Sequence, residues 1–354
     1  MCYSKIYKYA SLSRTRLTLR QLLSSQNILK KNENNTKYLL SNANFLKHEL
    51  SIRLSKRVVQ FKEFSKYNIF NTTNILKLYT ESSNKLISHS LITSENELIQ
   101  FKELVKNIKN KHKNVADQLS TNLIYKRDEL SNKEKRKIDT FLNTFYNSRI
   151  GIRILIGQFI SICEHKEGLF TACYPYTILN NVIDDINIII SDIYDSTIHI
   201  NILYGNNETD DLDLEMSNYN FMYVPSFVYY ILYEILKNSL EATYKNNKDE
   251  INIYISEGTD DIIIKISDQG KGLNKNKIPT LFSYCYSDID KEEVINNLRN
   301  NRFILSGYGH GLPLSKLYAQ YFGGDIQILT FKGIGTDTII YLNKLLDNQE
   351  KVIF

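Results

Sequence analysis

The chain has 354 residues, of which 42% are hydrophobic and 23% are charged, and its net charge is +5. This length favours two domains, and the composition is that of a folded protein whose basic residues lie beside acidic ones, which argues against nucleic-acid binding. No apolar run approaches the roughly 20 residues that cross a bilayer, and the cysteines and histidines lack the spacing of a disulfide framework or a zinc site.

The N-terminal segment is basic and rich in Ser, Thr and Leu, and it contains no acidic residue before Glu33. This composition is typical of a mitochondrial transit peptide. A basic helix of the mature domain explains it equally well, because Leu17 to Leu23 also fits the start of a fold. Both interpretations stay open on the sequence.

Long helices are predicted for the first half of the chain, which contains no Gly or Pro before Gly151. Apolar residues recur at helical spacing from Leu98 to Ile108 and again from Ile138 to Ile156. This pattern predicts a helical bundle over residues 1–170, with a domain boundary between Glu167 and Tyr176.

The second half, residues 171–354, is predicted to be an α+β domain. Short β-branched runs predict strands at Thr197–Tyr204, Ile251–Ile255, Ile262–Ile266, Ile326–Phe331 and Thr338–Leu342. Helical spacing predicts one helix from Pro225 to Tyr244 and another from Leu312 to Phe322.

Three polar residues of the first of these helices, Glu234, Asn238 and Glu241, are spaced four and three apart. They therefore share one face of the helix, opposite its apolar stripe. A solvated polar face explains such spacing equally well when a helix is considered alone. These three residues become candidates for a binding site because glycine-rich segments follow this helix in the chain.

An acidic residue at a strand end meets a glycine-rich turn at Asp268 to Gly272. A buried carboxylate there can accept a hydrogen bond from an amino group such as that of adenine, and glycines allow a ligand to approach the backbone. An ordinary strand-to-loop turn also contains this pattern. If Asp268 accepts a hydrogen bond from the amino group of adenine, the protein should bind ATP in preference to GTP.

A second glycine-rich segment, Gly307 to Leu312, leads directly into a helix. Free N–H groups at a helix start form a natural phosphate cradle. The polar segment from Ser287 to Ser306 precedes it and is typical of a lid that is mobile until nucleotide binds. Gly333 to Asp337 precedes the last strand and offers the Thr336 hydroxyl.

These four elements occur in an order that resembles the ATP-binding domain shared by DNA gyrase, a chaperone class, histidine kinases and mismatch-repair proteins. Several longer strings are similar to mitochondrial pyruvate and branched-chain α-ketoacid dehydrogenase kinases. In the second half they are Tyr223–Ser226, Glu234–Asn238, Leu281–Tyr284, Gly311–Ser315 and Leu317–Asp325, and in the first half Leu17–Leu23, His48–Leu54 and Ser148–Arg153.

The resemblance implies a helical bundle, with regulatory and E2-docking roles, followed by a histidine-kinase-like ATP-binding α/β sandwich. It implies a mitochondrial matrix enzyme that uses Mg-ATP to phosphorylate serine on the E1α subunit of an α-ketoacid dehydrogenase complex, thereby inactivating it. Docking to the lipoyl domain of the E2 core and a homodimer built through the nucleotide domains are also implied.

Within this framework, Glu234 is the expected catalytic base and Asn238 the expected Mg²⁺ ligand. The residues expected to contact the nucleotide are Asn238, Glu241, Asp268, Gly270, Gly272, Leu273, Ser287, Gly307, Tyr308, Gly309, His310, Gly311, Leu312 and Thr336.

The sequence departs from the family pattern at three places. Glu241 stands where the resemblance suggests Arg, Tyr230 stands where pyruvate dehydrogenase kinases tend to have His, and the chain ends at Phe354, which favours the branched-chain type slightly. Two other functions stay open: a histidine kinase, with His165 as the nearest phosphoacceptor, and a catalytically weak ATP-binding scaffold.

Overall fold

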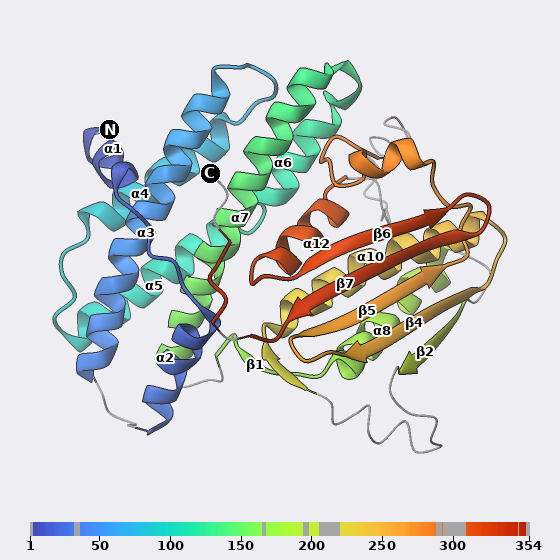
Figure 1. Ribbon diagram of the computed structural model, residues 1–354. Helices are drawn as coiled ribbons and strands as arrows, with labels where there is room; N and C mark the ends of the chain where they lie inside the picture. The colour runs from blue at the N-terminus through green and yellow to red at the C-terminus, as the bar shows by residue number, and fades with distance from the viewer. Residues whose placement is uncertain are drawn as a thin grey trace. The chain divides into compact units, whose positions relative to one another are not determined.

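The computed structural model describes residues 3–31, 36–164, 168–193, 198–204, 220–287, 292, 309–345 and 347–351. The chain divides into two compact units, with the boundary between Leu169 and Phe170. The first unit consists of helices, and the second contains a β-sheet with helices on it (Figure 1).

The N-terminal unit is built from helices of very different length. Those described are α1 (Tyr3–Ser11), α2 (Leu19–Lys31), α3 (Thr36–Ser65), α4 (Thr73–Ser88), α5 (Glu95–Lys111), α6 (Val115–Ile124) and α7 (Asn132–Cys163), with a 3-10 turn η1 (Arg127–Glu129). Ser94 and Ser131 begin α5 and α7 with reciprocal caps to Glu97 and Glu134. Such a cap satisfies N–H groups that a helix start leaves unbonded, so local sequence determines where these two helices begin.

Helices α3 and α7 carry the aromatic core of this unit. The rings of Phe64 in α3 and Phe141 in α7 are stacked with their centroids 3.9 Å apart, and Phe61 meets Phe145 edge-on at 5.2 Å. All four side chains are buried. Aromatic pairs at such separations stabilise packing beyond the burial of area alone, so these rings hold α3 against α7.

Charged side chains are buried beside this core. Glu49 accepts a hydrogen bond from Arg53 Nε at 2.7 Å and another from the Thr15 N–H at 3.2 Å. Arg57 donates to the Thr144 carbonyl at 3.1 Å, and burial beside other arginines lowers the pKa of Arg57 to about 10. Because buried charges need hydrogen-bonding partners, this network fixes the segment at Thr15 and helix α7 against α3.

The C-terminal unit contains a five-stranded sheet in the order β2-β4-β5-β7-β6, in which β2 is parallel to β4 and the other pairs are antiparallel. A separate antiparallel pair joins β1 to β3. The elements are β1 (Thr171–Cys173), α8 (Pro175–Ile193), β2 (His199–Tyr204), β3 (Phe221–Tyr223), α10 (Pro225–Lys245), β4 (Glu250–Glu257), β5 (Asp261–Asp268), η2 (Lys275–Thr280), α12 (Gly311–Gln320), β6 (Asp325–Phe331) and β7 (Gly335–Asn343).

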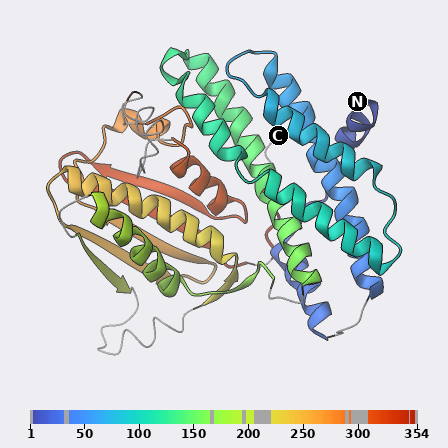
Figure 2. The same cartoon turned by 180° about the vertical axis from the view of Figure 1, so that it is seen from behind.

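The two faces of the sheet differ. Helices α8 and α10 lie over one face, as the view from behind shows (Figure 2), and alternate residues of β4 such as Ile253 and Ile255 are buried on that side. On the opposite face Tyr254 is 36% exposed and Leu329 is 48% exposed. Among the residues that the structure describes, no helix covers this second face (Figure 1).

The predicted division into a helical first half and an α+β second half is confirmed. The predicted strands all occur, with residue 197 outside the described part, and the two predicted helices are α10 and α12. Helix α8 was not predicted, because its Ile-rich sequence has an intrinsic preference for strands that packing against α10 overrides. The three-residue strands β1 and β3 were also missed, since they are too short to show a period.

The basic N-terminal segment that suggested a transit peptide lies partly in α1. This helix packs on α3, and its Ile6 is buried. Within the described ranges, no helix combines the length and the apolar character needed to span a bilayer.

Candidate functional site

Helix α10 carries three of the predicted site residues. Pro225 lies in its first turn, where the missing N–H costs no hydrogen bond. The apolar face, which includes the buried Ile235, packs on β5. Glu234, Asn238 and Glu241 are partly exposed, so the helix presents them on the side away from the apolar core.

The Glu234 carboxylate lies between α10 and the start of α12. Its Oε2 accepts a hydrogen bond from Lys237 Nζ at 2.7 Å, and a Cβ atom added at Gly311 would overlap the same oxygen. No other residue in the described part of the chain hydrogen-bonds to Glu234. Its Oε1 atom is therefore available to a ligand.

Asn238 lies one turn after Glu234, and its amide makes no hydrogen bond to any residue within the described ranges. Glu241, one turn further, forms an ion pair with Lys245 Nζ at 2.6 Å, and its side chain is only 14% exposed. The negative charge that this chain carries in place of the expected Arg is thus partnered within the helix.

Asp268 ends β5, the middle strand of the sheet. Its Oδ1 accepts hydrogen bonds from the N–H groups of Gly270 at 2.9 Å and Thr336 at 3.1 Å, whereas Oδ2 accepts none from a described residue. Burial raises the pKa of Asp268 to about 6, and the two N–H donors oppose that rise. An ionised Asp268 can therefore offer Oδ2 to an amino group.

Thr336 lies beside Asp268, and its main-chain N–H donates to the Asp268 carboxylate at 3.1 Å. The role of its hydroxyl toward a nucleotide stays a prediction. The hydroxyl oxygen of Thr336 lies 3.3 Å from that of Thr330. The antiparallel register, which pairs Asp268 with Thr336, produces this arrangement.

The glycines after Asp268 are required by close packing. Gly272 has a φ of +63°, and a Cβ atom there would overlap the Phe331 carbonyl oxygen. A Cβ atom at Gly270 would lie 2.9 Å from the Cβ of Ala242 in α10. Only glycine allows the turn to approach both β6 and α10 this closely.

The second glycine-rich segment is described only from Gly309 onward. Gly309 has a φ of +71°, and a Cβ atom there would lie 2.8 Å from the Tyr286 carbonyl oxygen. The buried His310 occupies the N-cap position of α12 without a capping bond from its side chain, and the first turn of α12 contains Gly311 and Leu312. Gly307, Tyr308 and the predicted lid, apart from Ser287 and residue 292, lie outside the described residues.

Helix α10 connects the two glycine-rich segments. Ala242 contacts Gly270, and Glu234 contacts Gly311, so the contacts lie eight residues or about 12 Å apart along the helix. An elongated ligand with its base at Asp268 and its phosphates at Gly311 would follow this line.

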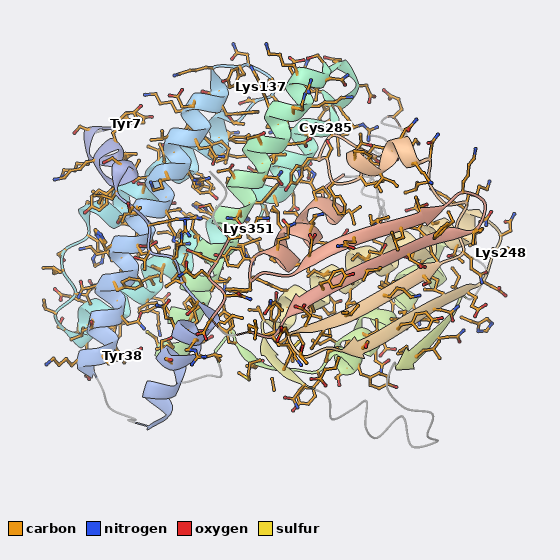
Figure 3. All side chains as sticks on the ribbon, viewed as in Figure 1. Tyr7, Tyr38, Lys137, Lys248, Cys285 and Lys351 are labelled. Carbon is orange, nitrogen blue, oxygen red and sulfur yellow. The ribbon has the colours of Figure 1, made fainter. Side chains whose placement is uncertain are left out.

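Two other predicted residues make different contacts. The Leu273 N–H donates to Thr330 Oγ1 at 2.6 Å, and Ser287 follows the buried Cys285, which is labelled in Figure 3. Neither residue hydrogen-bonds to Asp268 or Glu234 in the described part.

Two residues near these contacts were not predicted from the sequence. Thr330 accepts the hydrogen bond from Leu273, and Lys237 binds the Glu234 carboxylate. The Glu-to-Lys spacing of three residues on a helix was a signal for the second pair. No sequence signal pointed to Thr330.

The sheet, its helical cover and the carboxylate beside glycines define an ATP-binding fold of the histidine-kinase type. The family model described as "Histidine kinase-, DNA gyrase B-, and HSP90-like ATPase" matches residues 223–346. A second model, "Mitochondrial branched-chain alpha-ketoacid dehydrogenase kinase", matches residues 16–188. Both units of the chain are thus similar to known families.

Among similar proteins, the mitochondrial pyruvate dehydrogenase (acetyl-transferring) kinase of Arabidopsis thaliana is 31% identical over 98% of this chain and 94% of its own length. Isozyme 1 of Rattus norvegicus is 30% identical over 85% of this chain and 72% of its own. Isozyme 4 of Homo sapiens is 29% identical over 85% of this chain and 76% of its own length. The chain belongs to the mitochondrial pyruvate and branched-chain α-ketoacid dehydrogenase kinase family.

Membership of this family makes the chain a protein kinase and confirms the resemblance seen in its motifs. The position of Phe354 slightly favoured the branched-chain type, but the names of the relatives do not support that type. Those compared above are all named pyruvate dehydrogenase kinases.

Proposed function

We propose that the chain transfers the γ-phosphoryl group of Mg-ATP to a serine of the E1α subunit of the pyruvate dehydrogenase complex in the mitochondrial matrix, thereby inactivating the complex. The observation that carries the proposal is the Glu234 carboxylate beside Gly311 at the start of α12, whose Oε1 accepts no hydrogen bond from a described residue. The names of the relatives support the choice of substrate.

The nucleotide is proposed to bind with adenine at Asp268 and its phosphates at the glycines before α12. A carboxylate oxygen is an acceptor, which suits the amino group of adenine and not the carbonyl of guanine. The N–H groups of Gly311 and Leu312 at the start of α12 donate to no described residue and can face phosphate oxygens. ATP is therefore expected to bind more tightly than GTP in calorimetry, and equal affinities would remove this assignment.

Asn238 is proposed to contribute the protein ligand for Mg²⁺. No group of three or more His, Cys, Asp or Glu side chains that would hold a metal occurs in the described part of the chain. Mg²⁺ at nucleotide sites usually takes one or two protein oxygens and completes its shell with phosphates and water. The Asn238 amide, which makes no hydrogen bond within the described ranges, fits that need. The ion would neutralise charge on the phosphates.

Glu234 is proposed to act as the general base. Its Oε1 accepts the proton of the serine hydroxyl while the serine oxygen forms a bond to the γ-phosphorus. The bond between the γ-phosphorus and the bridging oxygen breaks, and ADP departs with that electron pair. A base of this kind contributes typically about 10²–10⁴-fold to the rate.

The partners are proposed from family membership. The helical unit would dock on the lipoyl domain of the E2 core and would carry regulation, and the nucleotide-binding units would pair as a homodimer. The uncovered face of the sheet, where Tyr254 and Leu329 are exposed, supports the second part of this proposal. Pull-down with each isolated lipoyl domain tests the first.

The direct test incubates the protein with γ-labelled ATP, Mg²⁺ and purified E1. Phosphoserine on E1α is the expected product. Phosphohistidine on the chain would indicate a histidine kinase, whose nearest phosphoacceptor, His165, lies outside the described residues. Absence of transfer with intact ATP binding would indicate a scaffold.

A further inference from the structure

We infer that Lys237 is a positioning residue for Glu234: its ammonium group holds one carboxylate oxygen so that the other faces the hydroxyl that is phosphorylated. This inference rests on the proposed function, because it takes Glu234 as the base. It adds a residue for which the motifs of the chain predicted no role.

The environment of Lys237 is unusual for a lysine. Its exposed fraction is 8%, and no other lysine is buried in the described part of the chain. Burying an ammonium group and ordering its long side chain both cost free energy, so such a lysine needs a strong partner. The partner is Glu234, whose Oε2 lies 2.7 Å from Nζ, and the Tyr233 ring lies 5.5 Å from the same nitrogen.

The contacts of Glu234 are asymmetric. Lys237 Nζ and the Gly311 backbone both approach Oε2, whereas Oε1 has no hydrogen-bonding partner in the part of the chain that the structure describes. Fixing one oxygen restricts rotation of the carboxylate about its last bonds. The unbonded oxygen is thereby left in a defined direction, as a general base requires.

Residue 230 is another position on α10 that can reach Glu234, since it lies one turn earlier. It is occupied by Tyr230, whose ring packs on Tyr318 of α12 with the centroids 5.0 Å apart. No hydrogen bond joins Tyr230 to Glu234, because Lys237 alone among the described residues bonds to that carboxylate. In this chain, positioning of the base therefore depends on Lys237.

The test compares Lys237→Met, which keeps the length without the charge, with Lys237→Arg, which keeps the charge. Glu234→Gln and the double variant Lys237→Met/Glu234→Gln complete a cycle. The control is Lys248→Met, because Lys248 lies exposed in the segment that joins the same helix to β4 (Figure 3). For each protein, kcat and KM for E1 phosphorylation, ATP affinity by calorimetry and the unfolding temperature are measured.

Lys237→Met is expected to lower kcat by about tenfold or more while ATP affinity changes by less than about threefold, because a misoriented base slows transfer without weakening nucleotide binding. Lys237→Arg should recover part of the rate. The double variant should be no slower than Glu234→Gln alone, because a lysine that acts only through Glu234 has no effect once the base is gone. Lys248→Met should match the parent.

A Lys237→Met protein with the parent kcat, or one whose loss is explained by weaker ATP binding alone, would overturn the inference. A double variant slower by the product of the two single effects would do the same. If Lys237→Met fails to fold, Lys237→Gln, which retains an uncharged hydrogen-bond donor, gives the same comparison. Glu234→Gln at the parent rate would instead remove the base assignment itself, so the two failures are distinguishable.

Discussion

Burial raises the pKa of the Asp268 carboxyl from its ordinary value of 3.8 to about 6. Between those two pH values the folded protein holds a proton that the unfolded chain has lost, so the stability of the nucleotide-free protein falls as pH rises toward 6. Ionisation of this buried carboxyl therefore costs folding stability. The cost is fully present above pH 6 and amounts to about 3 kcal/mol at most.

Asp268→Asn should remove that cost and lose the adenine contact. The Asn carbonyl can still accept the N–H groups of Gly270 and Thr336, but its amino group would face another amino group on adenine. We expect a higher unfolding temperature at pH 7.5 without nucleotide and at least about tenfold weaker ATP binding. Thermal unfolding and calorimetry check both. Unchanged ATP affinity would contradict the role of Asp268.

His112 shows the opposite dependence on pH. Burial, with a smaller effect from Arg149, lowers its pKa from 6.5 to about 4. Between these values the unfolded chain gains a proton that the folded protein does not, so stability falls as the solution is acidified from pH 6.5 toward 4, by up to about 3 kcal/mol.

His112→Gln should reduce this acid sensitivity, because an amide does not titrate and can still bond to Ser82, whose hydroxyl lies 2.9 Å from Nε2. The measurement compares the unfolding temperatures of parent and variant at pH 7.5 and pH 5. The unfolding temperature of the variant, relative to that of the parent, should be higher at pH 5 than at pH 7.5. A gap that is the same at both values would show that His112 is not responsible.

Gly311 offers a second way to move the Glu234 carboxylate. A Cβ atom there would overlap Oε2, which is the end of a flexible side chain and can shift. Gly311→Ala is therefore expected to fold, because the three atoms nearest the added Cβ all belong to this side chain, but to lower kcat. Steady-state kinetics and thermal unfolding test this together. A parent-like kcat would mean that the observed carboxylate position is not needed.

Helix α10 shows which parts of the site are predictable from sequence. Its start at Pro225, its apolar face and the spacing of Glu234 and Asn238 all follow from local pattern. The contact of Glu234 with Gly311 does not, because it depends on how α12 packs on α10. The same holds for Thr336, whose main-chain role follows from strand register and not from its side chain.

The sheet face that no described helix covers is the proposed contact of the homodimer. Leu329 and Tyr254 are exposed there, and exposed apolar side chains that share a sheet face are a typical protein contact. Light scattering should give twice the chain mass for the parent, and Leu329→Lys should shift the protein to the single-chain mass with unchanged ATP affinity. A parent that is monomeric at micromolar concentration would contradict the proposed homodimer.

The change from a helical first half to an α+β second half was predictable, because helical spacing dominates before Gly151 and short β-branched runs dominate later. Helix α8 was not, since its Ile-rich sequence favours a strand until packing against α10 is considered. The burial of charged residues such as Arg57 was also not predictable from the sequence, because charged residues on a helix are usually solvated.

We propose that α10 separates nucleotide binding from phosphoryl transfer, with Asn238 serving the first and Glu234 the second. ATP affinity by calorimetry and phosphoserine formation on E1α, measured for Glu234→Gln and Asn238→Ala, test it most directly. Glu234→Gln should bind ATP like the parent and lose about 10²–10⁴-fold in transfer, whereas Asn238→Ala should lose Mg²⁺-dependent ATP affinity. A Glu234→Gln protein that phosphorylates E1α at the parent rate would contradict the account.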